Sequence, residues 1–176
     1  SEQMSKKLMI GQNQRFAKAH AEAKKLIEGS LSELKHALSD HKLNLSDIKV
    51  DVSQKTVLVR ADLNVPMQNG QVSDLTRIER LGPTIRNLKD RGAKIILLSH
   101  FGRPKGQRSS EESLKNLLPA LTGAFGQTIS FANDCIGPEA EKASKMLQPG
   151  QILLLENLRF HEGEEKNDPI FAKALA

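Results

Sequence analysis

The amino-acid sequence predicts an α/β fold: a Rossmann-like parallel sheet with flanking helices, incomplete, and preceded by a helix–strand segment. Two observations carry this prediction. Beyond residue 54, short apolar runs of strand length alternate with helical stretches, as in parallel βαβ units with right-handed crossovers. These runs are almost continuously apolar, which is typical of strands in a sheet that is covered on both faces.

Residues 1–53 differ in pattern from the rest and are predicted to form a separate segment. One apolar stripe with helical spacing predicts an amphipathic helix over residues 15–41, and it consists of Ala23, Ile27, Leu31, Leu34 and Leu38. Residues 48–52 then alternate between apolar and polar, which predicts a half-buried strand. We therefore divide the chain into a leader, residues 1–53, and an α/β region, residues 54–176.

The α/β region contains four predicted strands separated by helices. The strands are expected at residues 56–60, 95–99, 128–131 and 151–155. The helices between them are expected at residues 84–91, 113–122 and 138–147. A last helix is predicted to begin near the end of the chain, with Asp168 as its N-cap and Pro169 in its first turn.

Composition excludes several classes of protein. The 176 residues include one cysteine, Cys135, which excludes an internal disulfide and a metal site made of several cysteines. No apolar run approaches the ~18 residues of a membrane span, and the first residues lack the apolar core of a secretory signal, so we expect a cytoplasmic protein. The net charge is +5, with no Trp and no Tyr, which favours a small anion over a nucleic acid as partner.

Basic and amide side chains follow three of the predicted strands, in the segments 60–66, 99–104 and 156–160. Open α/β sheets bind ligands at the carboxyl ends of their strands, and arginine recognises carboxylates and phosphates through two parallel hydrogen bonds. Gly102 would allow the backbone to approach a ligand closely. The pattern indicates an anion pocket. Each arginine alone is also compatible with a solvated surface charge, and His100 with a hydrogen-bonded loop residue.

The same segments carry a family resemblance. The chain contains, in this order, VLVRADLNVP at 57–66, TRI at 76–78, LLSHFGRP at 97–104, NDCIGP at 133–138, LLENLRF at 154–160 and GEEKND at 163–168. This ordered set resembles phosphoglycerate kinase over about residues 54–176, in the N-terminal domain of that family.

The resemblance implies a fold and a reaction. The family has two Rossmann-like domains joined by a hinge: the N-terminal domain binds 3-phosphoglycerate or 1,3-bisphosphoglycerate, and the C-terminal domain binds Mg-ADP or Mg-ATP. Closure allows phosphoryl transfer, a reaction that depends on positioning and charge stabilisation. By this resemblance the chain lacks the last strands of the N-terminal domain and the whole nucleotide domain, and it accordingly has no glycine-rich nucleotide motif. We therefore expect a truncated domain that holds no metal or cofactor and is inactive alone.

The resemblance also assigns roles to individual residues. Asp62 and Asn64 would contact the glycerate, while Arg77, His100, Arg103 and Arg159 would contact its anionic groups. Arg77 resembles the catalytic arginine, which stabilises the phosphoryl group during transfer. The residues themselves leave two alternatives open. Arg77 could be an ordinary charge on a helix surface, and Asp62 could serve only to orient Arg60 through an ion pair.

The leader is similar to a different family. Residues 26–34 and 43–48 resemble the helix–strand end of flagellar hook-length control proteins, which would make the chain a chimera. The alternative is an amphipathic leader that packs on the kinase-like region. A chimeric folding unit without catalytic function, which binds anions weakly at most, is therefore the second functional hypothesis.

Overall fold

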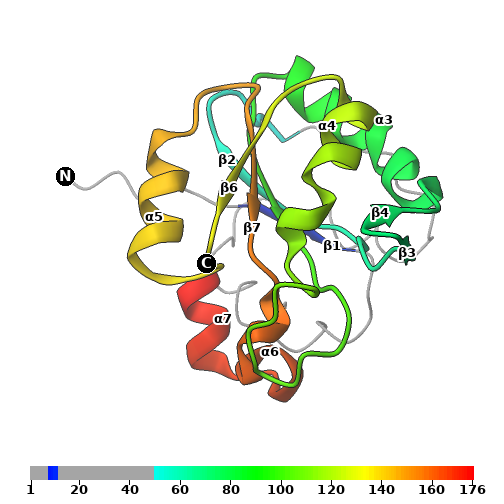
Figure 1. Ribbon diagram of the computed structural model, residues 1–176. Coiled ribbons are helices and arrows are strands. Elements are labelled where there is room, and N and C mark those ends of the chain that lie inside the picture. Colours follow the sequence, from blue (N-terminus) through cyan, green and yellow to red (C-terminus); the bar gives the residue numbers. More distant parts are fainter. Residues whose placement is uncertain (1–7, 12–49) are drawn as a thin grey trace, which may run out of the picture. The chain divides into compact units, whose positions relative to one another are not determined.

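The computed structural model describes residues 8–11 and 50–176, and a five-stranded sheet lies at their centre (Figure 1). The strands, in the order β1-β2-β5-β7-β6, are Leu8–Gly11, Thr56–Arg60, Lys94–Leu98, Ile152–Leu155 and Ile129–Ala132. All four pairings between neighbours are parallel. The predicted α/β class and parallel sheet are confirmed. The sheet belongs to one compact unit, residues 1–12 and 52–176, and residues 13–51 form a second.

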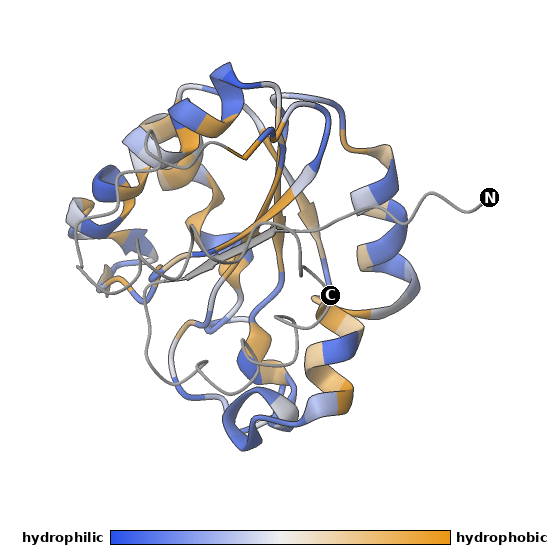
Figure 2. Cartoon of the chain, turned by 180° about the vertical axis from the view of Figure 1, so that it is seen from behind, coloured by the Kyte–Doolittle hydropathy of each residue, from blue (hydrophilic) through white to orange (hydrophobic). Residues whose placement is uncertain are grey.

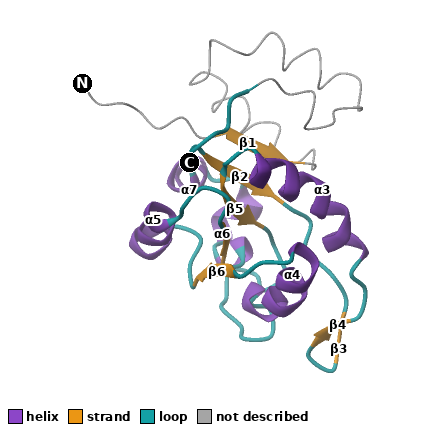
Figure 3. Ribbon diagram, turned by 90° about the horizontal axis from the view of Figure 1, so that it is seen from above, coloured by secondary structure: helices purple, strands orange, loops and turns teal. Residues whose placement is uncertain are grey.

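Helices cover both faces of the sheet. Seen from above, α3 and α4 lie on one side of the strands, and α5 and α7 lie on the other (Figure 3). These helices are α3 (Thr76–Asp90), α4 (Leu118–Phe125), α5 (Gly137–Met146) and α7 (Pro169–Leu175). The shorter elements are β3 (Met67–Gln68), β4 (Gln71–Val72), η4 (Leu114–Leu117), η5 (Leu158–Phe160) and α6 (Glu162–Lys166). In the described part of the chain, no helix has the length and apolar character needed to cross a membrane.

The core has one layer on each face of the sheet. In β7, Ile152, Leu153 and Leu154 are completely buried, which requires cover on both sides. On one face, Leu153 belongs to an apolar cluster that also contains Cys135 and Phe171. The hydropathy colouring shows the same division, with apolar strands at the centre and polar helix surfaces outside (Figure 2). Continuous apolar strands therefore correctly indicated a sheet that is buried on both faces.

Helix α3 is longer than predicted, because it begins at Thr76 rather than at residue 84. The prediction started after Pro83, since proline lacks the N–H that a helix interior requires. In the structure the helix continues through Pro83, whose ring lies on the exposed side, while Ile78 and Ile85 are buried against the sheet. The burial of this apolar stripe outweighs the loss of one exposed hydrogen bond.

The strand predicted at residues 48–52 is wrong for the residues that the structure describes. Val50, Asp51 and Val52 are not in a strand, and residues 48 and 49 lie outside the described residues. Val52 is buried just before a turn, in which the N–H of Lys55 donates to the Val52 carbonyl at 3.0 Å. The leader contributes β1 to the sheet instead, and Leu8 to Gly11 pair with Val57 to Arg60. The predicted helix at residues 15–41 lies outside the described residues.

Two short-range sequence signals, a helix cap and a hairpin turn, are found in the structure, and only the first was predicted. Asp168 is the N-cap of α7, as predicted, and its carboxylate accepts a hydrogen bond from the N–H of Ile170 at 2.7 Å. The hairpin of β3 and β4 was not predicted. Its turn is formed by Asn69 and Gly70, both with positive φ, a pair that is strongly favoured in two-residue hairpin turns.

Candidate functional site

Three strand-end loops meet at Gly102. Asn64 follows β2, Gly102 follows β5 and Arg159 follows β7, and these strands are neighbours in the sheet. The side-chain oxygen of Asn64 accepts a hydrogen bond from the Gly102 N–H at 3.0 Å. Nη1 of Arg159 donates to the Gly102 carbonyl at 3.2 Å. The parallel sheet thus brings together residues that lie 38 and 57 positions from Gly102 in the sequence.

A glycine is required at position 102 for two reasons. Its φ of +62° lies in the left-handed region, where other residues are strained. A Cβ atom there would also overlap the Glu112 carboxylate. The same carboxylate accepts a hydrogen bond from the N–H of Arg103 at 2.7 Å, so it fixes the loop from outside.

Arg77 and Asp62 form an exposed ion pair beside this loop. Nη1 of Arg77 lies 2.8 Å from both carboxylate oxygens of Asp62 and 3.1 Å from the Asn64 carbonyl. The two side chains are 49% and 59% exposed. Arg77 stands in the first turn of α3 and is held against the loop after β2, so it is more than a charge on a helix surface. The proposed Asp62–Arg60 pair is not formed, because Arg60 pairs with Glu164.

A buried ion cluster lies under the same edge of the sheet. One oxygen of Glu164 lies 2.8 Å from Nη2 of Arg60, and the other lies 3.2 Å from Nε of Arg159. The side chains of Glu164, Arg60 and Arg159 are 5%, 10% and 16% exposed. Glu164 belongs to α6 and thereby orients Arg159 toward Gly102. Sequence analysis assigned it no role, and its only signal was its place in the segment 163–168.

His100 is half-buried among these cations. Burial lowers the pKa of His100 below its ordinary value, and the charges of Arg159 and Arg60 lower it further. The imidazole is therefore neutral at neutral pH. A bound anion would offset the two arginine charges and so favour the protonated ring.

The side chain of Arg103 is the most available cation of the site. It is exposed, and among the described residues it has no hydrogen bond or ion pair through its guanidinium. Only its backbone N–H is engaged, by Glu112. A ligand at Gly102 could therefore recruit Arg103 without breaking an existing contact.

Three buried polar residues hold the loops in place, and sequence analysis did not single them out. Asn157, which is completely buried, donates to the carbonyls of Phe101 and Glu112 at 2.7 and 2.8 Å and accepts from the Phe101 N–H at 3.2 Å. The Ser99 hydroxyl donates to the Ala61 carbonyl at 2.9 Å. Glu156 accepts from the N–H of Leu114 at 2.9 Å. Because they are locked by buried bonds, the loops present a preformed surface.

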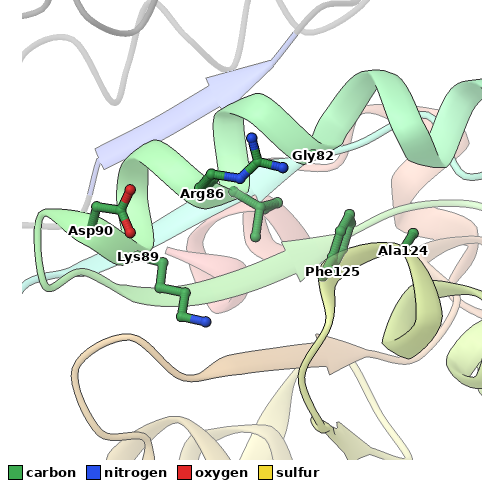
Figure 4. A pocket seen from close by; sticks show the side chains of 7 residues that line it. Gly82, Arg86, Lys89, Asp90, Ala124 and Phe125 are labelled. Carbon is green, nitrogen blue, oxygen red and sulfur yellow. The ribbon is translucent and has the colours of Figure 1, made fainter.

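A hollow lies between α3 and α4. Its volume is about 270 Å³, and residues of both helices line it (Figure 4): Gly82, Ile85, Arg86, Lys89, Asp90, Ala124 and Phe125. None of the six predicted site residues lines this hollow. The two features are therefore separate.

The chemistry at the strand ends suits a small anion. His100 and Arg103 belong to the loop that contains Gly102, and Arg159 contacts the Gly102 carbonyl. Arg77 adds a further cation, which is paired with Asp62. The one group of three metal-ligating side chains within residues 8–11 and 50–176 consists of Asp134, Cys135 and His161, and it includes none of the predicted site residues. The residues around Gly102 can bind and orient an anion through guanidinium groups.

The chain resembles known proteins over most of its length. The family model described as "Phosphoglycerate kinase" matches residues 45–176. Phosphoglycerate kinase of Rhodospirillum centenum is 54% identical over 127 residues, which are 72% of this chain and 32% of that protein. Phosphoglycerate kinase of Brucella melitensis is 59% identical over 126 residues, again 72% of this chain and 32% of the relative. The chain thus spans about one third of the length of these relatives.

Solved structures agree with the sequence relatives. The crystal structure of phosphoglycerate kinase from Pyrococcus horikoshii OT3 matches with a TM-score of 0.64 and 30% sequence identity. The matched region is 76% of this chain and 34% of the Pyrococcus chain. The structure of phosphoglycerate kinase from Coxiella burnetii matches with a TM-score of 0.63 and 34% sequence identity, over 76% of this chain and 32% of the Coxiella chain. The likeness in fold therefore extends over about three quarters of the chain.

Proposed function

This chain belongs to the phosphoglycerate kinase family, and from that premise we propose that its Gly102 loop binds 3-phosphoglycerate or 1,3-bisphosphoglycerate. The observation that supports the proposal is the meeting of three strand-end loops at Gly102, with Arg103 and Arg159 beside it. A phosphate or carboxylate accepts two hydrogen bonds from each guanidinium, and the buried Asn157 contacts fix the loop before the ligand arrives.

Each predicted site residue then has a role. Arg103, Arg159 and His100 bind the anionic groups, and Asp62 and Asn64 bind the glycerate. Arg77 is the catalytic residue and stabilises the phosphoryl group during transfer. For that step Arg77 has to exchange its contact with Asp62 for one with the substrate. Arg77 and Asp62 are 2.8 Å apart, and the Asp62 side chain is 59% exposed. Water therefore screens the ion pair, and the exchange of partners costs little free energy.

We propose that the chain binds this substrate but does not transfer a phosphoryl group by itself. Transfer from 1,3-bisphosphoglycerate to ADP requires a Mg-nucleotide, which the resemblance assigns to a C-terminal domain beyond the matched region. An assay with ADP and 1,3-bisphosphoglycerate should show no ATP formation. Activity that Arg77→Ala abolishes would contradict this part of the proposal.

Two further predictions concern the cellular location of the protein and the origin of residues 1–53. A cytoplasmic location remains a prediction from composition. The separate origin of residues 1–53 also remains a prediction, and the family match begins at residue 45, within the leader.

A titration of the full chain with 3-phosphoglycerate at low salt, monitored by NMR, tests the proposed binding. We expect saturable shifts of the Asn64, His100 and Gly102 amides with a dissociation constant on the order of 1 mM, since a few charge-assisted bonds oppose the entropy cost of association. Added salt should weaken binding, because the arginines face solvent.

Arg103→Ala is the decisive variant, because that side chain has no partner among the described residues and its loss should leave the fold intact. We expect at least a threefold weaker affinity. Arg86→Ala removes an equally exposed arginine from the outer part of α3 and is the matched control. Saturable shifts that both variants leave unchanged would overturn the proposed site. The absence of any saturable shift would favour the alternative, a folding unit without a substrate.

A further inference from the structure

Asp134, Cys135 and His161 bring an oxygen, a sulfur and a nitrogen donor within 4.8 Å of one another. Asp134 and Cys135 stand between β6 and α5, while His161 comes from the junction of η5 and α6. The cluster is separate from the proposed anion site, to which none of the three residues was assigned. It is also the only group of three such donors among the described residues.

The surrounding structure fixes the orientation of each donor. Nε2 of His161 lies 2.7 Å from Oδ1 of Asp134, and the ring packs on Phe171 with centroids 5.4 Å apart. Cys135 is 2% exposed and packs in the same apolar cluster as Phe171. Nη2 of Arg108 lies 2.6 Å from Oδ2 of Asp134, so Arg108 pairs with the carboxylate oxygen that does not contact His161. The donors are therefore oriented by packing and hydrogen bonds rather than free in solvent.

This combination of donors selects one class of metal ion. Mg²⁺ and Ca²⁺ require oxygen ligands, whereas Zn²⁺ accepts thiolate, imidazole and carboxylate at about 2.0–2.3 Å. Around tetrahedral Zn²⁺ such ligand atoms lie about 3–4 Å apart, so the widest separation in the trio needs to close by about 1–2 Å. The side chains of Asp134 and His161 are each 29% exposed, which gives a metal ion and a water ligand access from solvent.

We propose that Asp134, Cys135 and His161 bind one Zn²⁺ ion, with water as the fourth ligand. The ion replaces the hydrogen bond between His161 and Asp134, and Arg108 remains as the outer partner of the carboxylate. The Cys135 thiol loses its proton to solvent as the sulfur–metal bond forms. The expectation of no metal in this chain rested on the lack of several cysteines and on the magnesium site that the resemblance assigns to the C-terminal domain. A site of mixed donors needs a single cysteine.

Titration with Co²⁺ tests the proposal, because a Co²⁺–thiolate bond gives a charge-transfer absorption band that carboxylates and imidazoles do not give. We expect the band to saturate at one equivalent of Co²⁺ and to disappear when Zn²⁺ is added. Cys135 is the only cysteine of the chain, so the band can come only from this residue. Cys135→Ser should abolish it, and His161→Gln should weaken Co²⁺ binding at least tenfold.

The other histidines of the chain require a control. The titration should use the full chain with His20, His36 and His41 changed to Gln, so that His100 and His161 remain. Glu141→Gln is the matched carboxylate control, because Glu141 lies on the neighbouring helix α5 with a 65% exposed side chain. It should leave the Co²⁺ band and the stoichiometry unchanged.

A second measurement covers variants that fold poorly. Zn²⁺ should raise the melting temperature of the unaltered chain, and Asp134→Asn should reduce that increase. The proposal is overturned if the folded, unaltered chain shows no charge-transfer band with several equivalents of Co²⁺. It is also overturned if Glu141→Gln lowers the affinity as much as His161→Gln, because binding would then be nonspecific.

Discussion

Two ion clusters at the carboxyl edge of the sheet use the same chemistry at different depths. Glu164 joins Arg60 and Arg159 at 2.8 and 3.2 Å, and all three side chains are at most 16% exposed. Asp62 and Arg77 are also 2.8 Å apart, but about half of each side chain faces water. Almost equal distances thus occur in very different dielectric surroundings.

This difference separates a fixed support from a contact that can exchange. Removing one partner of a buried pair leaves a desolvated charge, so the geometry around Glu164 is strongly held. Water replaces either partner of the exposed pair at little cost. The structure thus holds Arg159 rigidly beside Gly102 and leaves Arg77 able to exchange its contact with Asp62.

The largest effect is expected for Glu164→Gln. The neutral amide no longer compensates the buried charge of Arg159 and removes the carboxylate from Arg60, so we expect a loss of about 3–5 kcal/mol in unfolding free energy. Urea denaturation measures the change in unfolding free energy. Glu165→Gln is the matched control, since Glu165 is 49% exposed and 3.7 Å from Arg159, and it should cost less than about 1 kcal/mol. Equal losses for the two variants would remove the distinction between the clusters.

A smaller loss of unfolding free energy, about 1–3 kcal/mol, is expected for Asn157→Ala, because the buried Phe101 carbonyl and the partly buried Glu112 carbonyl lose their donor. This variant should also weaken the binding of 3-phosphoglycerate, since the loop that contains Gly102 is no longer fixed. Denaturation and the NMR titration measure the two effects. Unchanged binding would show that the buried support is not needed for the site.

The pH dependence of stability tests the burial of His100 beside Arg159 and Arg60. Its pKa is lower in the folded chain than the ordinary value of 6.5, so the unfolded chain binds the proton more readily. Stability is therefore complete above about pH 6.5 and falls as the pH drops toward the folded pKa. His100→Gln should remove this component of the slope. In NMR, 3-phosphoglycerate should raise the pKa of His100, and an unchanged pKa would place the anion elsewhere.

The smallest effect is expected for Asp62→Asn. Because the pair with Arg77 is exposed, its loss should change the unfolding free energy by less than about 1 kcal/mol. Thermal denaturation, with Glu164→Gln measured in parallel, makes the comparison direct. A loss similar to that of Glu164→Gln would mean that Arg77 cannot exchange partners readily.

The sequence alone predicted the features that local patterns encode. Continuous apolar runs located β2, β5, β6 and β7, and the pair Asp168–Pro169 located the start of α7, because capping and strand burial depend on neighbouring residues. The ordered motifs also indicated the family, and the roles of the six site residues stay a prediction from that resemblance. The start of α3 was missed because Pro83 is a strong local signal, which the burial of Ile78 and Ile85 outweighs.

Only the tertiary structure decided which distant residues meet. The pairing of Glu164 with Arg60 spans 104 positions, and that of His161 with Asp134 spans 27, and no local pattern distinguishes these partners from other charged residues. The same holds for β1, which pairs with β2 although residues 48–52 show the clearer strand pattern. The sequence located β2, β5, β6 and β7 and the polar groups that follow three of these strands. The order of strands, and with it the partner of each charge, depends on packing across the whole sheet.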